Sequence, residues 1–160
     1  MRHNDVKKII AYYYGIPAMC RLLDAERAEL ESEYDGLRGS SMNGMPHGST
    51  PGKPTEAMAE RTDALRVWNR LEAIRVRGHV LSMDRDLICG CLDALNGEYK
   101  RLIVMRYRDK YSWVKMSVRS GAAEKTIRRR HDRAVDRLGE VLDDAPMIDE
   151  VLGRASRARV

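Results

Sequence analysis

The sequence predicts an all-α protein, and three observations support this fold class. Of the 160 residues only 6% are aromatic and none is Phe, so a core must be built from aliphatic side chains and Met. This composition suits helices, whereas a β-sandwich or barrel would need more Val, Thr and aromatic residues. Apolar side chains also recur at helical spacing in several segments. We expect an N-terminal helical hairpin or long helices, followed by a small domain of short helices.

Several classes of protein are excluded by simple features of the chain. No segment approaches the ~18 consecutive apolar residues of a membrane span, and the apolar patch from Ile9 to Ile16 is too short for a signal peptide. The three cysteines are an odd number, which argues against a disulfide framework and favours a cytoplasmic location. Cys89 and Cys91 do not have the spacing of a zinc site, so we expect small buried thiols on a helix and no metal or cofactor.

The N-terminal segment, residues 1–35, contains one amphipathic helix. Leu23 and Leu30 lie on one stripe among Glu and Arg, which predicts a helix over roughly 17–36 that opens at Pro17. Residues 36–54 contain five of the 12 glycines and three of the 5 prolines, and no apolar periodicity survives there. This composition predicts a flexible Gly/Pro-rich linker.

Residues 55–95 form a second helical segment. Thr55 and Glu56 are typical of a helix start. The residues that follow share one helical face and predict either one long helix or a helix pair. These residues are Val67, Leu71, Ile74, Gly78, Leu81, Ile88, Leu92 and Leu95. Two amphipathic helices joined by a linker would form an antiparallel hairpin. A two-helix hairpin buries little apolar surface alone. The apolar stripes of the two helices therefore form either an ordinary core within one chain or the interface of a homodimer through the N-terminal helices.

Three short helices are expected over residues 96–143. Asn96 and Gly97 break the preceding helix, and Ser112 is a good N-cap for the second short helix, which carries Trp113 and Met116. Ser120-Gly121 predicts a tight turn before a third helix, whose inner face is Ile127, Ala134, Leu138 and Val141. Two helices joined by a tight Gly-containing turn are the helix-turn-helix arrangement. Residues 144–160 are expected to be a polar C-terminal tail.

The positive charge of the chain is concentrated in this third region. The whole chain has a net charge of +5, but residues 97–142 carry 13 basic and 6 acidic side chains. Such a local excess is typical of a nucleic-acid-binding surface, although a solvated Arg-rich helix face gives the same count. The N-terminal turns of the third helix can reach base edges in the major groove. The candidate DNA-binding residues are Lys125, Thr126, Arg128, Arg129, Arg130 and Arg133.

Four stretches of this region resemble region 4 of bacterial sigma factors, the helix-turn-helix that reads the promoter −35 element. They are Ala94–Tyr107, Tyr111–Met116, Glu124–Arg130 and Arg133–Leu138, and the resemblance covers roughly residues 92–142. The chain departs from the family pattern at Ser117, where Ala is common, at Ser120, where Leu is common, and at Ala123, where Ser or Thr caps the recognition helix. Loss of that cap costs ~1 kcal/mol, offset in part by Glu124 in the first turn.

The order of segments is similar to that of small phage transcriptional regulators of the RinA/ArpU type. That resemblance implies an activator of late phage genes in a bacterial host. The resemblance to sigma region 4 implies that RNA polymerase is a possible second partner, beside DNA. A small terminase subunit for phage DNA packaging, and a protein-interaction module with an acidic partner, are the alternative functions. We do not expect an enzyme or a catalytic residue, because the four histidines are scattered and no nucleotide-binding glycine motif occurs.

Overall fold

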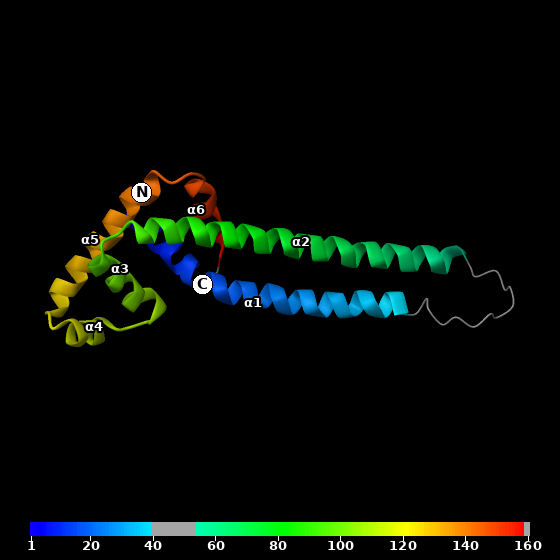
Figure 1. Ribbon diagram of the computed structural model, residues 1–160, viewed down its shortest axis with the longest axis horizontal. Helices are drawn as coiled ribbons and strands as arrows, with labels where there is room; N and C mark the ends of the chain where they lie inside the picture. Colours follow the sequence, from blue (N-terminus) through cyan, green and yellow to red (C-terminus); the bar gives the residue numbers. More distant parts are fainter. Residues whose placement is uncertain (40–53, 159–160) are drawn as a thin grey trace. The chain divides into compact units, whose positions relative to one another are not determined.

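The computed structural model describes residues 1–39 and 54–158, and the side chains of 1–35 and 61–158. Within these ranges it contains six α-helices, one π-helical segment and no strand, so the all-α prediction is confirmed (Figure 1). The linker was predicted over 36–54, but residues 36–39 are the last turn of the first long helix and Pro54 begins the second, so both predicted bounds are wrong. The rest of the predicted linker, 40–53, lies outside the described residues. The chain divides into two units, Met1–Pro17 with Ser82–Val160, and Ala18–Leu81, and each is described by itself.

The second unit is formed by parts of two long helices, α1 (His3–Gly39) and α2 (Pro54–Asp93). Within this unit the two helices lie side by side (Figure 1). Leu30, Val67 and Ile74 are buried between them, and Leu23, Tyr34 and Leu71 are partly buried against that cluster. Glu26 of α1 pairs with Arg70 at 3.9 Å and with Arg77 at 3.6 Å on one side of this contact. The long α2 is unbroken, so the structure has one helix here and not a pair.

The start of α1 differs from the sequence prediction, because the helix begins at His3 and Pro17 lies inside it. Proline lacks the backbone N–H and clashes with the preceding turn, so it normally begins a helix or kinks one. Here the preceding residues have their own packing: Val6, Ile9, Ile10 and Ile16 are buried in the first unit. Tertiary burial of these side chains, and not local propensity, determines where α1 starts.

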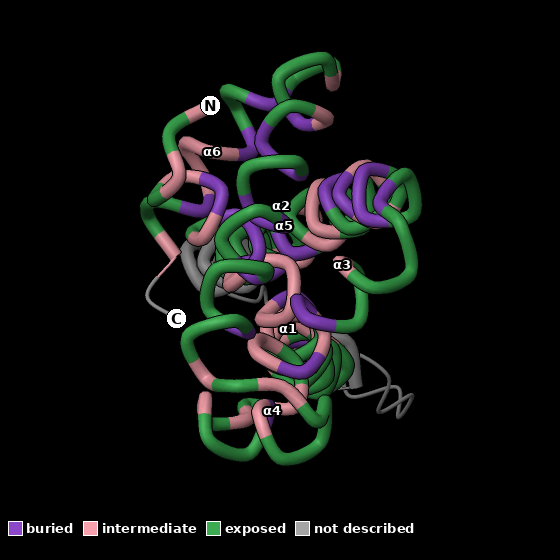
Figure 2. Tube along the Cα trace, turned by 90° about the vertical axis from the view of Figure 1, so that its left-hand side faces the viewer, coloured by how far each residue is buried: buried purple, intermediate pink, exposed green. Residues whose placement is uncertain are grey.

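The first unit adds the short helices α3 (Gly97–Ile103), α4 (Trp113–Ser120), α5 (Glu124–Asp143) and α6 (Ile148–Arg157). A π-helical turn, η1 (Val104–Arg108), continues α3, and Asp109 is its C-terminal cap. Buried and exposed positions alternate along the helices (Figure 2). The long α5 contributes many of the buried ones, among them Ile127, Ala134, Leu138 and Leu142. Val141, predicted on the inner face, is only half-buried, and its neighbour Leu142 is buried instead.

The chain start packs closely against α5. A Cβ atom added at Gly139 would lie 3.1 Å from Cγ2 of Val6, so a larger residue here would require Val6 to shift by a few tenths of an ångström. The ring of His3 bonds Asp136 at 2.8 Å, and the N-terminal amino group pairs with Asp143. These contacts place the first turns of α1 along the second half of α5.

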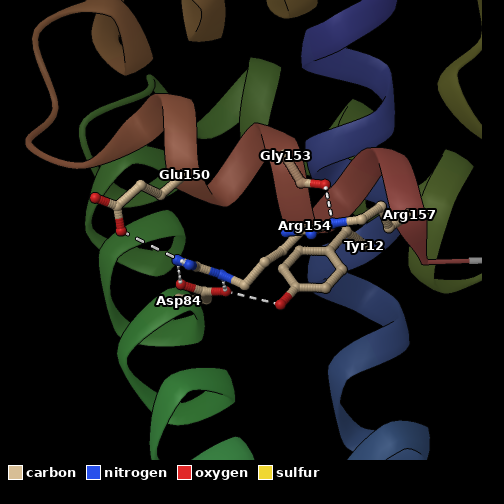
Figure 3. Close-up of polar contacts among 6 residues, drawn as sticks. All are labelled: Tyr12, Asp84, Glu150, Gly153, Arg154 and Arg157. Atoms are coloured by element: carbon tan, nitrogen blue, oxygen red, sulfur yellow. Dashed lines mark hydrogen bonds and ion pairs between the residues drawn. The ribbon is translucent and has the colours of Figure 1, made fainter.

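The polar tail predicted over 144–160 is instead a helix that packs into the first unit. Ile148, Val151 and Ala155 of α6 are buried, and Arg154 reaches the buried carboxylate of Asp84 on α2 (Figure 3). The guanidinium donates to both Asp84 oxygens, at 2.8 and 2.7 Å, and the Tyr12 hydroxyl donates to one of them at 2.7 Å. Burial raises the pKa of Tyr12 above its ordinary value, and the bond to Asp84 adds to this. The network therefore joins α1, α2 and α6.

Candidate nucleic-acid interface

The segment from Asn96 to α5 has the local caps that the sequence predicts. The Asn96 side chain accepts a bond from the Tyr99 amide at 2.8 Å and begins α3. Ser112 does the same for α4, accepting from the Lys115 amide at 3.2 Å. Gly121 ends α4 in the left-handed conformation, with φ of 62°, which a residue with a side chain adopts at a penalty. The turn predicted at Ser120-Gly121 is confirmed.

The helix α5 begins after Ala123 without a side-chain cap, as expected from the departure at that position. The turn before it is held differently. The Ser117 hydroxyl donates to the Ala122 carbonyl at 2.6 Å, so this serine bonds across the turn. This bond fixes the chain directly before the first residue of α5.

A small apolar core fixes α4 against α5. Leu102, Met105, Met116 and Ile127 are buried together, and Tyr111, Trp113 and Ala122 pack against them. Because Ile127 occupies the second turn of α5, its burial turns the neighbouring basic residues outward. All six candidate residues are exposed: Lys125, Thr126, Arg128, Arg129, Arg130 and Arg133.

The structure divides these six residues between two flanks of α5. At about 100° per residue, Lys125, Arg128 and Arg129 share one flank. Thr126, Arg130 and Arg133 lie on the other. Lys125, Arg129 and Arg133 make no side-chain hydrogen bond or ion pair within the described ranges, so their charges are available to a ligand.

Arg128 is held in place by its neighbours. Its Nε donates to Glu124 at 3.0 Å, one turn earlier on α5, and its guanidinium lies 5.3 Å from the centre of the Trp113 ring. The guanidinium of Arg106 lies over the same ring, at 4.4 Å. Two cations therefore share one indole, a favourable arrangement that restricts both side chains. Arg128 is the most restricted of the candidate residues on its flank.

Arg130 has a different environment from Arg128. It pairs with Glu98 of α3 at 3.0 Å, beside a cavity of about 300 Å³ whose basic lining is Arg101, Arg119 and Arg130. Its guanidinium is therefore held against α3 by an acidic partner.

Sequence reasoning did not select the basic residues of α4. Lys115 lies 4.0 Å from the centre of the Tyr111 ring, and Arg119 donates to the Tyr111 hydroxyl at 3.3 Å. Both side chains are exposed and belong to the same basic region. The signal that could have found them is the alternation of basic and aromatic residues between Arg106 and Arg119.

His131 is the one buried histidine in the described part of the chain, and it lies directly beneath the basic face. Its ring stacks on Tyr107 at 5.8 Å and meets the edge of Trp113 at 5.1 Å between ring centres. Its Nε2 has no hydrogen-bond partner in the structure. Burial lowers the pKa of His131 below its ordinary value of 6.5, although Asp132 opposes this. The ring is therefore neutral at pH 7 and acts as part of the core.

The comparisons with known proteins add no relative to this picture. No protein-family model matches the chain, and neither a curated protein nor a solved structure shows significant similarity to it. Among the described side chains, no three His, Cys, Asp or Glu residues are grouped so that they could hold a metal ion. Within the same ranges, no helix combines the length and the hydrophobicity that crossing a bilayer requires.

Proposed function

We propose that this chain binds double-stranded DNA in a sequence-specific manner and regulates transcription. One observation carries the proposal: the first turns of α5, which follow a left-handed glycine turn, expose Lys125, Arg128 and Arg129 on one flank. A helix fits the major groove of B-DNA, and its N-terminal residues reach the base edges.

In this proposal the basic residues have two roles. Arg128, restricted by Glu124 and Trp113, is suited to a fixed bidentate contact with guanine, which is worth about 1–3 kcal/mol of discrimination. Lys125 and Arg129 extend the same flank, and Arg130, Arg133, Lys115 and Arg119 are placed for phosphates. Phosphate contacts position a protein on the duplex, and base contacts give the specificity.

The cellular setting remains part of the proposal. The order of segments is similar to that of RinA/ArpU-type regulators, which favours late phage genes as targets. The stretches that resemble sigma region 4 make RNA polymerase a possible second partner. Oligomeric state separates this function from DNA packaging, because a ring of many subunits would favour a small terminase subunit. A protein-interaction module would bind an acidic protein partner, and it would select no particular sequence from a pool of random duplex DNA.

The direct test begins with selection of bound sequences from a random duplex pool by the purified full chain. Fluorescence anisotropy with the selected duplex then compares the chain with a triple variant, Lys125→Ala, Arg128→Ala and Arg129→Ala. We expect the variant to lose sequence-specific binding while its helical circular dichroism is unchanged. Unaltered affinity would contradict the assignment of α5.

A matched control removes the same amount of charge elsewhere. Arg21, Arg66 and Arg85 are exposed and lie outside the basic region. Their triple replacement by Ala should leave specific binding within a few-fold of the unmodified chain. If both triple variants bind equally poorly, the effect comes from net charge alone.

A further inference from the structure

The helix α2 has an apolar face that nothing in the described part of its own unit covers. Leu65, Trp68 and Val76 are 59%, 56% and 51% exposed. At about 100° per residue the three fall within about 80° of one another. Val67 and Ile74, which are buried against α1, point to the opposite side of the helix. The second unit therefore has one apolar face inside the hairpin and another outside it.

A groove between α1 and α2 adjoins this outer face. It consists of two adjacent hollows of about 270 and 220 Å³, which share Arg27 and Arg75 in their lining. Leu23 and Ile74 line the first hollow, and Trp68 and Leu71 line the second. Trp68 thus belongs both to the exposed face and to the wall of the groove.

Among the described side chains of the second unit, few apolar ones are buried. The buried cluster there is Leu30, Val67 and Ile74, with Leu23, Tyr34 and Leu71 partly buried against it. A Trp that is more than half exposed beside an apolar groove is the type of residue that dominates binding energy at protein interfaces. The exposed face of α2 and the adjoining groove are therefore a candidate protein-binding surface.

The charges that line this groove favour a second copy of the chain as the partner. The charged residues that line the groove are Asp24, Arg27, Glu31, Glu72 and Arg75, so acid and base nearly balance. A balanced surface does not attract nucleic acid. It does complement itself, because a two-fold axis places the same patch of both copies face to face.

We propose that two copies of the chain pair through this face with their α2 helices antiparallel. An axis midway between Glu72 and Arg75 sets Glu72 of each copy opposite Arg75 of the other. The same axis sets Trp68 opposite His79. The ion pair that Glu72 and Arg75 make within one chain, at 2.6 Å, is then shared between the two chains.

The oligomeric state of the full chain tests this pairing. Sedimentation velocity should show a dimer at micromolar concentration, and Trp68→Glu should raise the dissociation constant at least about 30-fold. Leu22 is the matched control, because it is 71% exposed but lies on α1, away from the groove lining. Leu22→Glu should leave the dimer intact. A chain that is monomeric at 100 μM, or a dimer that Trp68→Glu does not weaken, overturns the proposal.

A charge-reversal experiment tests the register. Glu72→Arg alone and Arg75→Glu alone each place like charges across the axis, so each variant should be monomeric. Mixed together, the two variants have opposite charges at both contacts and should form a heterodimer. Pairing within one chain cannot produce this result, because each variant keeps two like charges on its own helix. Failure of the mixture to associate overturns the antiparallel register.

Discussion

Replacement of Arg154 by Ala should destabilise the first unit strongly, because it leaves a buried charge without its partner. Asp84 is 2% exposed, and its carboxylate accepts two bonds from Arg154 and one from Tyr12 (Figure 3). Removal of one member of a buried pair costs about 3–5 kcal/mol, since the remaining ion has lost its compensation. The Arg154 side chain is 28% exposed, so water can reach part of the vacated space.

The expected loss is therefore near the lower end of that range, about 3 kcal/mol. For a chain of this size this corresponds to a fall in melting temperature of roughly 6–12 °C. Urea unfolding followed by circular dichroism at 222 nm gives the free energy of unfolding directly. Tyr12→Phe removes one bond and keeps the ion pair, so it should cost only about 1–2 kcal/mol.

The matched control is Arg157→Ala on the same helix. Arg157 is exposed, and its side chain bonds the Gly153 carbonyl at 3.1 Å (Figure 3). Its loss should change the free energy of unfolding by less than about 0.5 kcal/mol. Equal effects of Arg154→Ala and Arg157→Ala would refute the reasoning, because the buried carboxylate would then not depend on its guanidinium.

Three further predictions concern the helix-turn-helix region. Because burial lowers the pKa of His131, the unfolded chain binds a proton below pH 6.5 that the folded chain does not. The free energy of unfolding should therefore decrease as the pH is lowered below 6.5, and it should decrease less steeply in His131→Phe. Equal slopes in the two proteins would contradict this. Ser112→Ala should cost about 1 kcal/mol in urea unfolding through loss of its cap bond, whereas Ser156→Ala, at an exposed site, should have almost no effect. Gly121→Ala should cost about 1 kcal/mol because of its positive φ, and an unchanged unfolding midpoint would show that the turn relaxes.

The parts of the fold that the sequence predicted are those with strong local signals. Asn96 and Ser112 are short polar residues of the types that cap helices, and Gly121 follows a short amphipathic segment. Each acts on its own neighbours through a cap bond or a left-handed turn. The exposure of the α5 basic residues followed in the same way from the position of Ile127.

The features that were missed depend on contacts between distant residues. The sequence predicts a helix start at Pro17 because nothing local shows that Val6 and Ile9 are buried. It predicts a polar tail in place of α6 because this helix is short and the residue before it, Met147, provides no side-chain cap. Its stability comes from buried apolar residues and from Arg154, whose partner Asp84 is 70 positions away.

The candidate site shows the same division. Helical periodicity in the sequence already places Arg128 and Arg130 on different flanks of α5. Only the fold shows that Arg130 lies beside Glu98 and Arg128 beside Trp113. Both partners belong to other helices, 32 and 15 positions away in the chain. Charge along one helix therefore predicted the surface, and the packing of α3 and α4 determined how each side chain is held.

The most direct test of the central claim is parallel selection of binding sites from random duplex DNA by the chain and by Arg128→Ala. If α5 reads the major groove, the unmodified chain selects a defined sequence. The variant should lose preference at one or two adjacent base pairs and keep the rest. Identical preferences in both proteins, or no sequence preference in the unmodified chain, would contradict the claim that Arg128 and the helix that carries it read DNA.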